Sequence, residues 1–153
     1  METLRPILAA MPFFDGMKPE HLDLIVGCAA NVRFAPREFV ARQGETADRF
    51  LIVRKGRVAL EVHAPGRGEV TLQTVGEGEV LGWAWLVPPY RWHVDVRALT
   101  ETRALSFDGR CLRTKFEADT RLGYDVMMRF SQLMSQRLEA MSLQLLDLYA
   151  SHA

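Results

Sequence analysis

The sequence predicts a mainly β protein, an antiparallel β-roll or jelly roll of about eight strands with flanking helices. Three observations support this: apolar residues at helical spacing near the N-terminus, period-two alternation with a turn signal every eight to twelve residues in the middle, and a heptad pattern at the end. We expect a single domain over residues 1–153, with N-terminal helices in 1–30, the roll in 31–108 and C-terminal helices in 109–153.

Two short helices are expected before the roll. Pro19 stands near the first position of the second one, where its missing N–H costs little. A turn at residues 13–16 separates the two helices. Their apolar positions are Leu4, Ile7, Leu8 and Met11, then Leu22, Ile25, Val26 and Ala29.

Turn residues separate the expected strands of the roll. Glycine or proline marks two of these turns, and we read residues 54–57 as the turn of a β-hairpin. The strands of this hairpin are 50–53 and 58–62. A second turn at residues 63–68 leads into a strand at 70–72. A third pair of strands, 94–98 and 102–107, folds back around Thr100 and Glu101.

The C-terminal helix has two apolar stripes. One has the a/d spacing of a coiled coil and predicts a homodimer, although a stripe of this length also fits a helix that packs on its own roll. The other is Val126, Phe130, Leu133 and Arg137, which would leave one face for the roll and one for a partner. The a/d stripe, here called the seam, is Met127, Ser131, Met134, Leu138, Met141, Leu145 and Leu148.

Composition narrows the partners. Lys plus Arg and Asp plus Glu both total 19, so overall charge does not favour DNA or an anionic membrane. No apolar run approaches the ~20 residues of a membrane helix, and no secretory leader is evident. We expect a cytoplasmic protein with no membrane association and no direct sequence-specific DNA binding, in which Cys28 and Cys111 are buried free thiols.

The motifs of the sequence do not predict an enzyme. Gly76, Gly78 and Gly82 approach a dinucleotide fingerprint, but their spacing is wrong and a β-roll has no βαβ unit. A metal-binding jelly roll needs clustered histidines, and no nucleophile elbow is present. The four histidines are scattered at His21, His63, His93 and His152.

Helices, a β-roll and one long helix together resemble the cyclic-nucleotide-binding domain of the catabolite activator (Crp/Fnr-type) family. Residues 39–45 (FVARQGE) are similar to its strand and Gln-Gly-Glu turn, residues 50–58 (FLIVRKGRV) to its Ile-x-x-Gly-x-Val segment, and residues 128–139 to its dimer helix. The family continues into a helix-turn-helix domain. The present sequence reads only to Ala153, so the resemblance implies the sensor half without the DNA-reading half.

The stretch from Gly76 to Val94 corresponds to the family's phosphate cassette, which holds a cyclic phosphate at a helix N-terminus. Gly82 matches the family's glycine. Trp83 stands where the family has a glutamate for the ribose, and Trp92 where it has the phosphate-pairing arginine. Losing each contact should cost about 1.5–3 kcal/mol, so we expect no cyclic AMP binding of the usual kind.

Four aromatic side chains, Trp83, Trp85, Tyr90 and Trp92, fall within ten positions. They predict either a flat apolar pocket that stacks an effector, or a nucleotide site filled by the protein's own indoles. The expected ligand-binding residues are Gly82, Trp83, Ala84, Trp85, Arg91, Trp92, His93 and Ser142.

Two of these residues carry particular roles. Arg91 lies one position from the missing arginine and is either a replacement anion ligand or a solvated arginine. Where the family has a Thr-Ser pair that contacts the base, this sequence has Met141 and Ser142, so only Ser142 could still make that contact. We therefore expect no cofactor other than a cyclic nucleotide or another small anionic or flat effector. The function is either a small-molecule sensor module or a non-binding scaffold that docks a separate protein.

Overall fold

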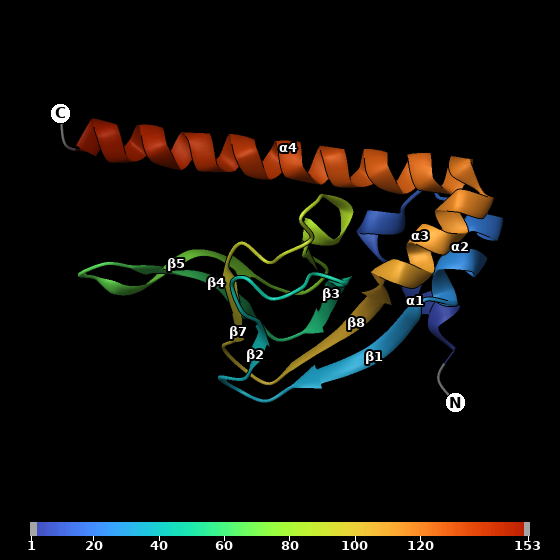
Figure 1. The fold of residues 1–153 in the computed structure, drawn as a ribbon, viewed down its shortest axis with the longest axis horizontal. Helices are drawn as coiled ribbons and strands as arrows, with labels where there is room; N and C mark the ends of the chain where they lie inside the picture. The colour runs from blue at the N-terminus through green and yellow to red at the C-terminus, as the bar shows by residue number, and fades with distance from the viewer. Residues whose placement is uncertain (1–2, 152–153) are drawn as a thin grey trace. The chain divides into compact units, whose positions relative to one another are not determined.

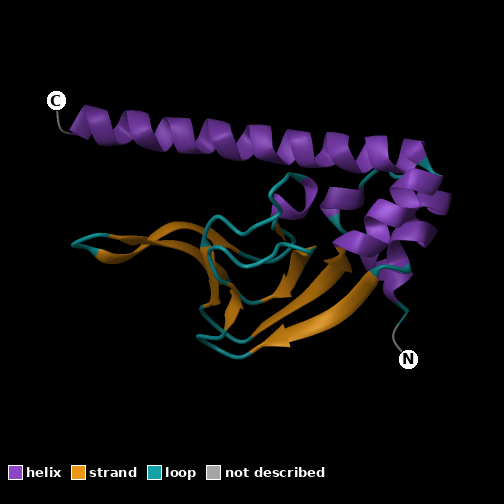
Figure 2. Ribbon diagram, in the orientation of Figure 1, coloured by secondary structure: helices purple, strands orange, loops and turns teal. Residues whose placement is uncertain are grey.

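The computed structural model describes residues 3–151. The chain divides into two compact units, one up to Lys115 and one from Phe116. Figure 1 shows the strands of the first unit forming a roll with short helices α1, α2 and α3 at one end, and Figure 2 colours the same elements by type. The predicted fold class is confirmed: the described residues hold eight strands, short N-terminal helices and one long C-terminal helix.

The N-terminal helices form where the apolar spacing predicts. They are α1 (Leu4–Ala9), the 3-10 helix η1 (Pro12–Phe14) and α2 (Pro19–Val26), with Pro19 at the first position of α2. The turn expected at residues 13–16 thus begins inside a 3-10 helix. Leu8, Phe14 and Ile25 are buried and anchor these helices.

The roll consists of two four-stranded antiparallel sheets. Sheet A has the order β1-β8-β3-β6 and sheet B the order β2-β7-β4-β5. The strands of sheet A are β1 (Ala29–Phe34), β8 (Thr102–Asp108), β3 (Arg49–Lys55) and β6 (Val80–Leu81). Those of sheet B are β2 (Phe39–Ala41), β7 (Asp95–Ala98), β4 (Val58–Ala64) and β5 (Gly68–Val75).

Two of the predicted strand pairings are wrong. β3 and β4 do not form a hairpin, because β3 pairs with β6 and β8 whereas β4 pairs with β5 and β7. The segment 54–57 instead carries the chain from sheet A to sheet B. β7 and β8 are likewise consecutive strands in different sheets. Alternation and turn residues indicate where strands end, but not which sheet each strand joins.

Gly56 shows why this crossing is tight. Its φ is 102°, and a Cβ at this position would lie 2.5 Å from the carbonyl oxygen of Glu101. A glycine tolerates both the conformation and the close approach of the segment before β8. The pairing expected around residues 63–68 is confirmed, since Ala64 pairs with Gly68 across the β4–β5 hairpin.

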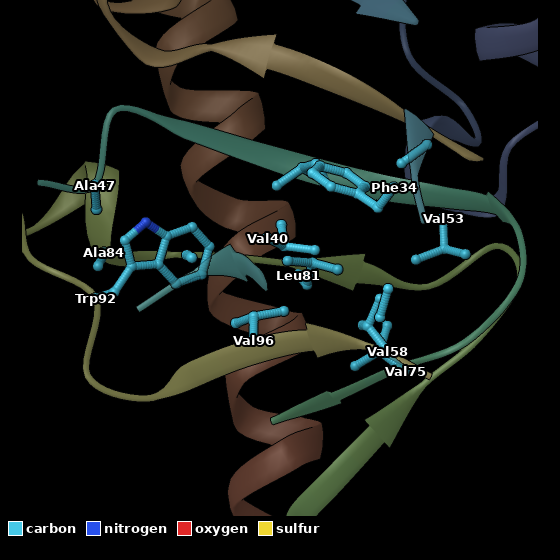
Figure 3. Packing of buried hydrophobic residues seen from close by; sticks show 14 residues of the cluster. Phe34, Val40, Ala47, Val53, Val58, Val75, Leu81, Ala84, Trp92 and Val96 are labelled. Carbon is cyan, nitrogen blue, oxygen red and sulfur yellow. The ribbon is translucent and has the colours of Figure 1, made fainter. Parts of the chain in front are cut away.

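The interior of the roll is apolar and includes one indole. Its buried cluster joins both sheets, as alternating inward-facing side chains require. Figure 3 shows Trp92 at one end of this cluster, beside Ala47 and Ala84. The members are Phe34, Val40, Ala41, Ala47, Leu51, Val53, Val58, Val75, Leu81, Ala84, Trp92, Val96, Ala98 and Ala104.

The two cysteines are not free thiols. Cys28 and Cys111 form a disulfide with a Cα–Cα separation of 5.7 Å, across 83 residues of sequence. The sequence prediction failed because the two positions are far apart along the chain. The fold brings them together, since Cys28 immediately precedes β1 and Cys111 lies in the first turn of α3 (Gly109–Ala118).

The second unit contains α4 (Thr120–Ser151), a helix of 32 residues. Leu122, Val126 and Phe130 are buried in its first turns, whereas every described residue after Arg137 is exposed. The second predicted stripe thus falls on partly or fully buried positions. The seam side chains are exposed instead.

Candidate functional site

The segment that corresponds to the cassette begins on a strand and ends on a strand. It runs from β6 through Gly82, the 3-10 helix η2 (Ala84–Leu86) and a cis Pro88-Pro89 bond to β7. Gly82 has φ 93°, the left-handed region that favours glycine. Glycine at this position gives the chain the sharp turn between β6 and η2.

Trp92 lies inside the roll and against Gly82. A Cβ on Gly82 would stand 2.8 Å from Cη2 of Trp92, so the indole occupies the space that the glycine leaves free. Only 7% of Trp92 is exposed, and its neighbours in the cluster include Leu81, Ala84 and Val96. Gly82, Ala84 and Trp92 therefore lie together, with the indole against the glycine, and their predicted role in ligand binding stays a prediction.

Backbone hydrogen bonds hold Trp92 in place. Its N–H donates to the Glu45 carbonyl at 2.9 Å, and its own carbonyl accepts from the N–H of Gly44 at 2.9 Å. The Ala47 N–H donates to the Tyr90 carbonyl at 2.8 Å. The end of the cassette is thus paired with the turn at residues 43–47. Sequence reasoning identified both segments but not this pairing.

Trp85 belongs to a different part of the core. Its ring stacks on Phe50 with centroids 5.5 Å apart, and Phe50 stacks on Phe107 at 4.4 Å. Because Phe50 alternates with Leu51 along β3, this aromatic stack lies on the face of sheet A opposite the roll interior. Trp85 is fully buried there, and the structure does not place it with Trp92 in one aromatic pocket.

Helix α3 makes a contact to the cassette that the sequence did not predict. Arg113 donates from Nη1 to the Trp85 carbonyl at 2.8 Å, and its guanidinium lies 5.3 Å from the Tyr90 ring centroid. Gly109 lets α3 approach closely, since a Cβ there would be 3.1 Å from the Trp85 ring. The beginning of α3 and the cassette are therefore mechanically connected.

The exposed edge of the cassette carries Trp83, His93 and Arg91. The Trp83 and His93 rings stack with centroids 4.9 Å apart, and Trp83 is partly buried against the core cluster. Arg91 is exposed and donates from Nη1 to the Gly44 carbonyl at 2.9 Å. Its guanidinium thus caps the 43–47 turn, and its predicted role as an anion ligand stays a prediction.

A partly buried ion pair lies on sheet B. Arg97 donates from Nε and Nη2 to the two carboxylate oxygens of Glu61, at 3.0 and 2.8 Å, and only 5% of the Glu61 side chain is exposed. The hydrogen bond and the charge of Glu61 hold the pKa of Arg97 above its ordinary value. Both carboxylate oxygens of the buried Glu61 side chain thus have a hydrogen-bond partner in a bidentate pair.

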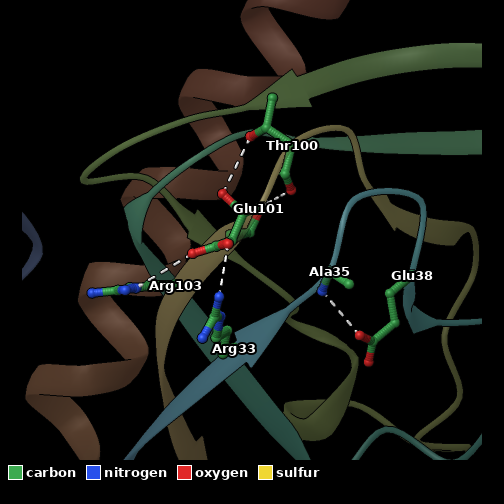
Figure 4. Close-up of polar contacts among 7 residues, drawn as sticks. Arg33, Ala35, Glu38, Thr100, Glu101 and Arg103 are labelled. Atoms are coloured by element: carbon green, nitrogen blue, oxygen red, sulfur yellow. Dashed lines mark hydrogen bonds and ion pairs between the residues drawn. The ribbon is translucent and has the colours of Figure 1, made fainter.

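A second charged cluster is exposed near the start of β8. Arg33 donates to Glu101 at 2.8 Å, and Arg103 lies 3.8 Å from the same carboxylate, as Figure 4 shows. The hydrogen bond from Arg33 and its positive charge lower the pKa of Glu101. Glu38 accepts from the Ala35 N–H at 3.0 Å in the turn before β2.

The seam residues on α4 form an exposed apolar stripe. Leu138, Leu145 and Leu148 are each more than half exposed, and Met127, Met134 and Met141 are exposed as well. Ser142 donates to the Leu138 carbonyl at 2.9 Å, a helix-internal bond. Its contact with a ligand and the dimer interface stay predictions.

Among residues 3–151, no three His, Cys, Asp or Glu side chains are grouped as a metal site would require. His152, the fourth histidine of the sequence, lies outside this range. Within the same residues, no helix has the length and apolar character needed to cross a membrane.

Comparison with known proteins identifies the family. The family model described as Cyclic nucleotide-binding domain matches residues 31–119. Because the match covers more than half of the chain, the protein belongs to the cyclic nucleotide-binding domain family. The resemblance recognised in the turn and strand motifs is thus confirmed.

Individual relatives agree with this assignment. The chain is 29% identical over 108 residues to the CRP-like cAMP-activated global transcriptional regulator of Mycobacterium tuberculosis. These 108 residues make up 71% of this chain and 48% of the relative. The chain therefore spans about half the length of the curated relatives it matches.

Two solved structures share the fold. A cyclic nucleotide-binding domain from Methylobacillus flagellatus has a TM-score of 0.80 at 18% identity, covering 94% of this chain and 80% of that one. The Thermus thermophilus catabolite activator protein has a TM-score of 0.72 at 24% identity, covering 91% and 63%. Both contain the same roll and helices, so they support the architecture described above.

Proposed function

We propose that this protein is a non-enzymatic regulatory module of the cyclic nucleotide-binding type in which Trp92 closes the nucleotide site. The observation that carries this proposal is the position of the indole, buried within the roll against Gly82. The module would then act by docking a separate protein. Cyclic AMP held in the family's usual way has no part in it.

The chemistry at the two divergent positions supports closure. An indole has one N–H donor and no charge, so Trp92 cannot form the bidentate pair that a guanidinium makes with a phosphate. Trp83 offers no carboxylate to accept hydrogen bonds from a ribose. A nucleotide entering the interior would also have to displace Trp92 from its packing, which adds the free-energy cost of emptying a filled core position.

A second candidate, a sensor for a small flat or anionic effector, is favoured by the edge of the cassette. There His93, whose ring stacks on that of Trp83, lies two positions from Arg91, which is exposed. Stacked rings beside a cation suit a planar anion. In this alternative the effector binds on the edge of the roll and leaves Trp92 in place.

Titration separates the two candidates. Wild type, Trp92→Ala and Arg91→Ala are titrated calorimetrically with cyclic AMP, cyclic GMP and a set of planar organic anions, and melted with the same compounds. If Trp92 closes the nucleotide site, titrating wild type with a cyclic nucleotide should give no saturable heat of binding. Saturable cyclic AMP binding by wild type, accompanied by a rise in melting temperature, refutes closure.

The Arg91→Ala variant tests the second candidate. If a planar anion binds at the edge, this substitution should weaken binding by about 1.5–3 kcal/mol and leave folding almost unchanged, because the side chain is exposed. If no compound in the set binds wild type, the scaffold function stands.

Assembly and location complete the proposal. The exposed seam on α4 supports a homodimer, because an apolar stripe of this length is unfavourable in water. In a two-fold dimer, the seam of each copy is buried against the seam of the other. The balanced charge supports a module that binds neither an anionic membrane nor a specific DNA sequence by itself, and the compartment that we propose is the cytoplasm.

A further inference from the structure

The disulfide joins two elements at the helical end of the roll. Cys28 is buried just before β1, and its carbonyl accepts from the Asp108 N–H at 3.0 Å. Cys111 is only partly buried, and its sulfur lies 4.0 Å from the Gly27 carbonyl. Cys111 is therefore the less buried of the two half-cystines and the one that we expect an external thiol to attack.

The disulfide at Cys111 and the contacts to the cassette involve the same first turns of α3. Two residues beyond Cys111, Arg113 donates to the Trp85 carbonyl and covers Tyr90. The Gly109 N–H donates to the Asp48 carbonyl at 2.7 Å. The start of α3 thus has three fixed points: the disulfide, the Asp48 carbonyl and the cassette. Breaking one of them changes how firmly the other two are held.

The surroundings of Cys111 favour a thiolate when the bond is open. The residue lies in the first turn of a ten-residue helix, at the positive end of the helix dipole, which stabilises negative charge. Lys115, one turn further along α3, donates to the Leu24 carbonyl, and its Nζ would meet a Cβ on Gly27. The ammonium and the sulfur therefore border the same glycine. Asp108, whose carboxylate accepts from the Cys111 N–H at 3.0 Å, opposes this effect.

We infer that Cys28–Cys111 is a reversible thiol–disulfide switch that controls the hold of α3 on the cassette. A dithiol reductant acts in two steps. Its thiolate attacks the Cys111 sulfur, the S–S bond breaks, and Cys28 leaves with the electron pair and takes up a proton. The second thiol of the reductant then attacks the mixed disulfide, releasing Cys111 as a thiolate and the reductant as its own disulfide.

This switch goes beyond the proposed function. It rests on that proposal in one respect, the cytoplasmic location, because the cytoplasm is a reducing compartment. In such a compartment, disulfides are typically transient and redox-active rather than structural. The switch acts through α3 whether or not an effector binds, so its failure in the tests below does not affect the nucleotide titration.

Hydrogen exchange tests the switch on the full chain. Wild type is compared oxidised and after reduction with dithiothreitol, beside the double variant Cys28→Ser, Cys111→Ser. We expect reduction to speed amide exchange in residues 84–92 and 109–115 by at least about threefold, and to have no effect on the double variant, which should match reduced wild type. Equal exchange in oxidised and reduced wild type overturns the inference.

Alkylation tests the chemistry at Cys111. In Cys28→Ser, the pH dependence of iodoacetamide modification should have a midpoint below the ordinary thiol value of about 8.5. Lys115→Gln should move this midpoint upward, whereas Arg67→Gln, which removes a distant cation in the β4–β5 turn, should not. A midpoint at or above the ordinary value, or a disulfide that reduces only when the protein unfolds, also overturns the switch.

Discussion

Trp92 packs its indole against Gly82, and neither position tolerates a simple exchange. A side chain on Gly82 would collide with Cη2 of Trp92, since its Cβ would lie at 2.8 Å. Removing the indole would leave a space in the buried cluster that Trp92 now fills. The glycine and the tryptophan thus form one structural unit within the cassette.

Trp92→Ala should therefore lower the free energy of unfolding by about 3–5 kcal/mol, as expected for the loss of a buried large side chain. Trp83→Ala is the matched control in the same segment. Its ring is only partly buried, so its substitution should cost less. Urea denaturation of both variants measures the difference, and equal losses would contradict the packing described here.

The seam on α4 predicts a charge-sensitive dimer. Leu145→Glu places two carboxylates face to face in an apolar interface, so the dimer should dissociate or unfold. Leu143→Glu is the control, because Leu143 is equally exposed but lies two residues away, on the opposite side of the helix. Light scattering measures the mass of each variant. A monomeric wild type, or dissociation by both substitutions, would remove the seam as the interface.

The disulfide should contribute substantially to stability. It closes a loop across 83 residues, so Cys111→Ser should lower the free energy of unfolding by about 2–5 kcal/mol relative to oxidised wild type. Reduction of wild type should produce a similar loss. Denaturation with and without reductant measures both, and an unchanged midpoint would show that the bond does not form in solution.

The ion pair between Arg33 and Glu101 predicts a pH dependence of definite sign. Because the pKa of Glu101 is lowered, the pair contributes stability above the ordinary carboxyl range, and that contribution is lost as the pH falls through the lowered value. Wild type should melt slightly above Arg33→Ala at pH 7, and the two should converge in acid. The difference should be small, since both side chains are exposed. Arg103→Ala, which removes the more distant cation, should show a smaller effect.

The 153-residue chain should bind duplex DNA only weakly and without sequence preference. Its net charge is zero, and α4 carries three basic and three acidic residues among Arg121, Asp125, Arg129, Arg137, Glu139 and Asp147. Few phosphates can be neutralised by such a surface. Footprinting at physiological salt tests this, and a protected sequence-specific site would contradict it.

Much of the fold could be read from local patterns. The position of Pro19, the turn at residues 63–68 and the heptad spacing from Met127 each depend on a few neighbouring residues, and all three elements form as expected. The assignment of strands to sheets could not be read in this way. β3 and β4 follow one another but pair with partners remote in sequence.

The candidate site was predictable only in part. Gly82 carries a local signal, because a sharp turn after a strand needs a positive φ. The separation of Trp85 from Trp92 has no such signal, since both are large aromatic residues seven positions apart. Which side of sheet A each ring occupies depends on Phe50 and on the approach of Gly109, and these are tertiary contacts. The pairing of Cys28 with Cys111 was missed for the same reason.

The strand order of sheet A also constrains when the protein can fold during synthesis. β1 has its ladder with β8, from Ala29 opposite Phe107 to Phe34 opposite Thr102, and β3 depends on β8 as well. The first strand made must wait for the last one to leave the ribosome, while the β4–β5 hairpin can close at once. With so many contacts between distant residues, we expect slow, nearly all-or-none folding late in translation, with β1 in need of protection until residues 102–108 have emerged.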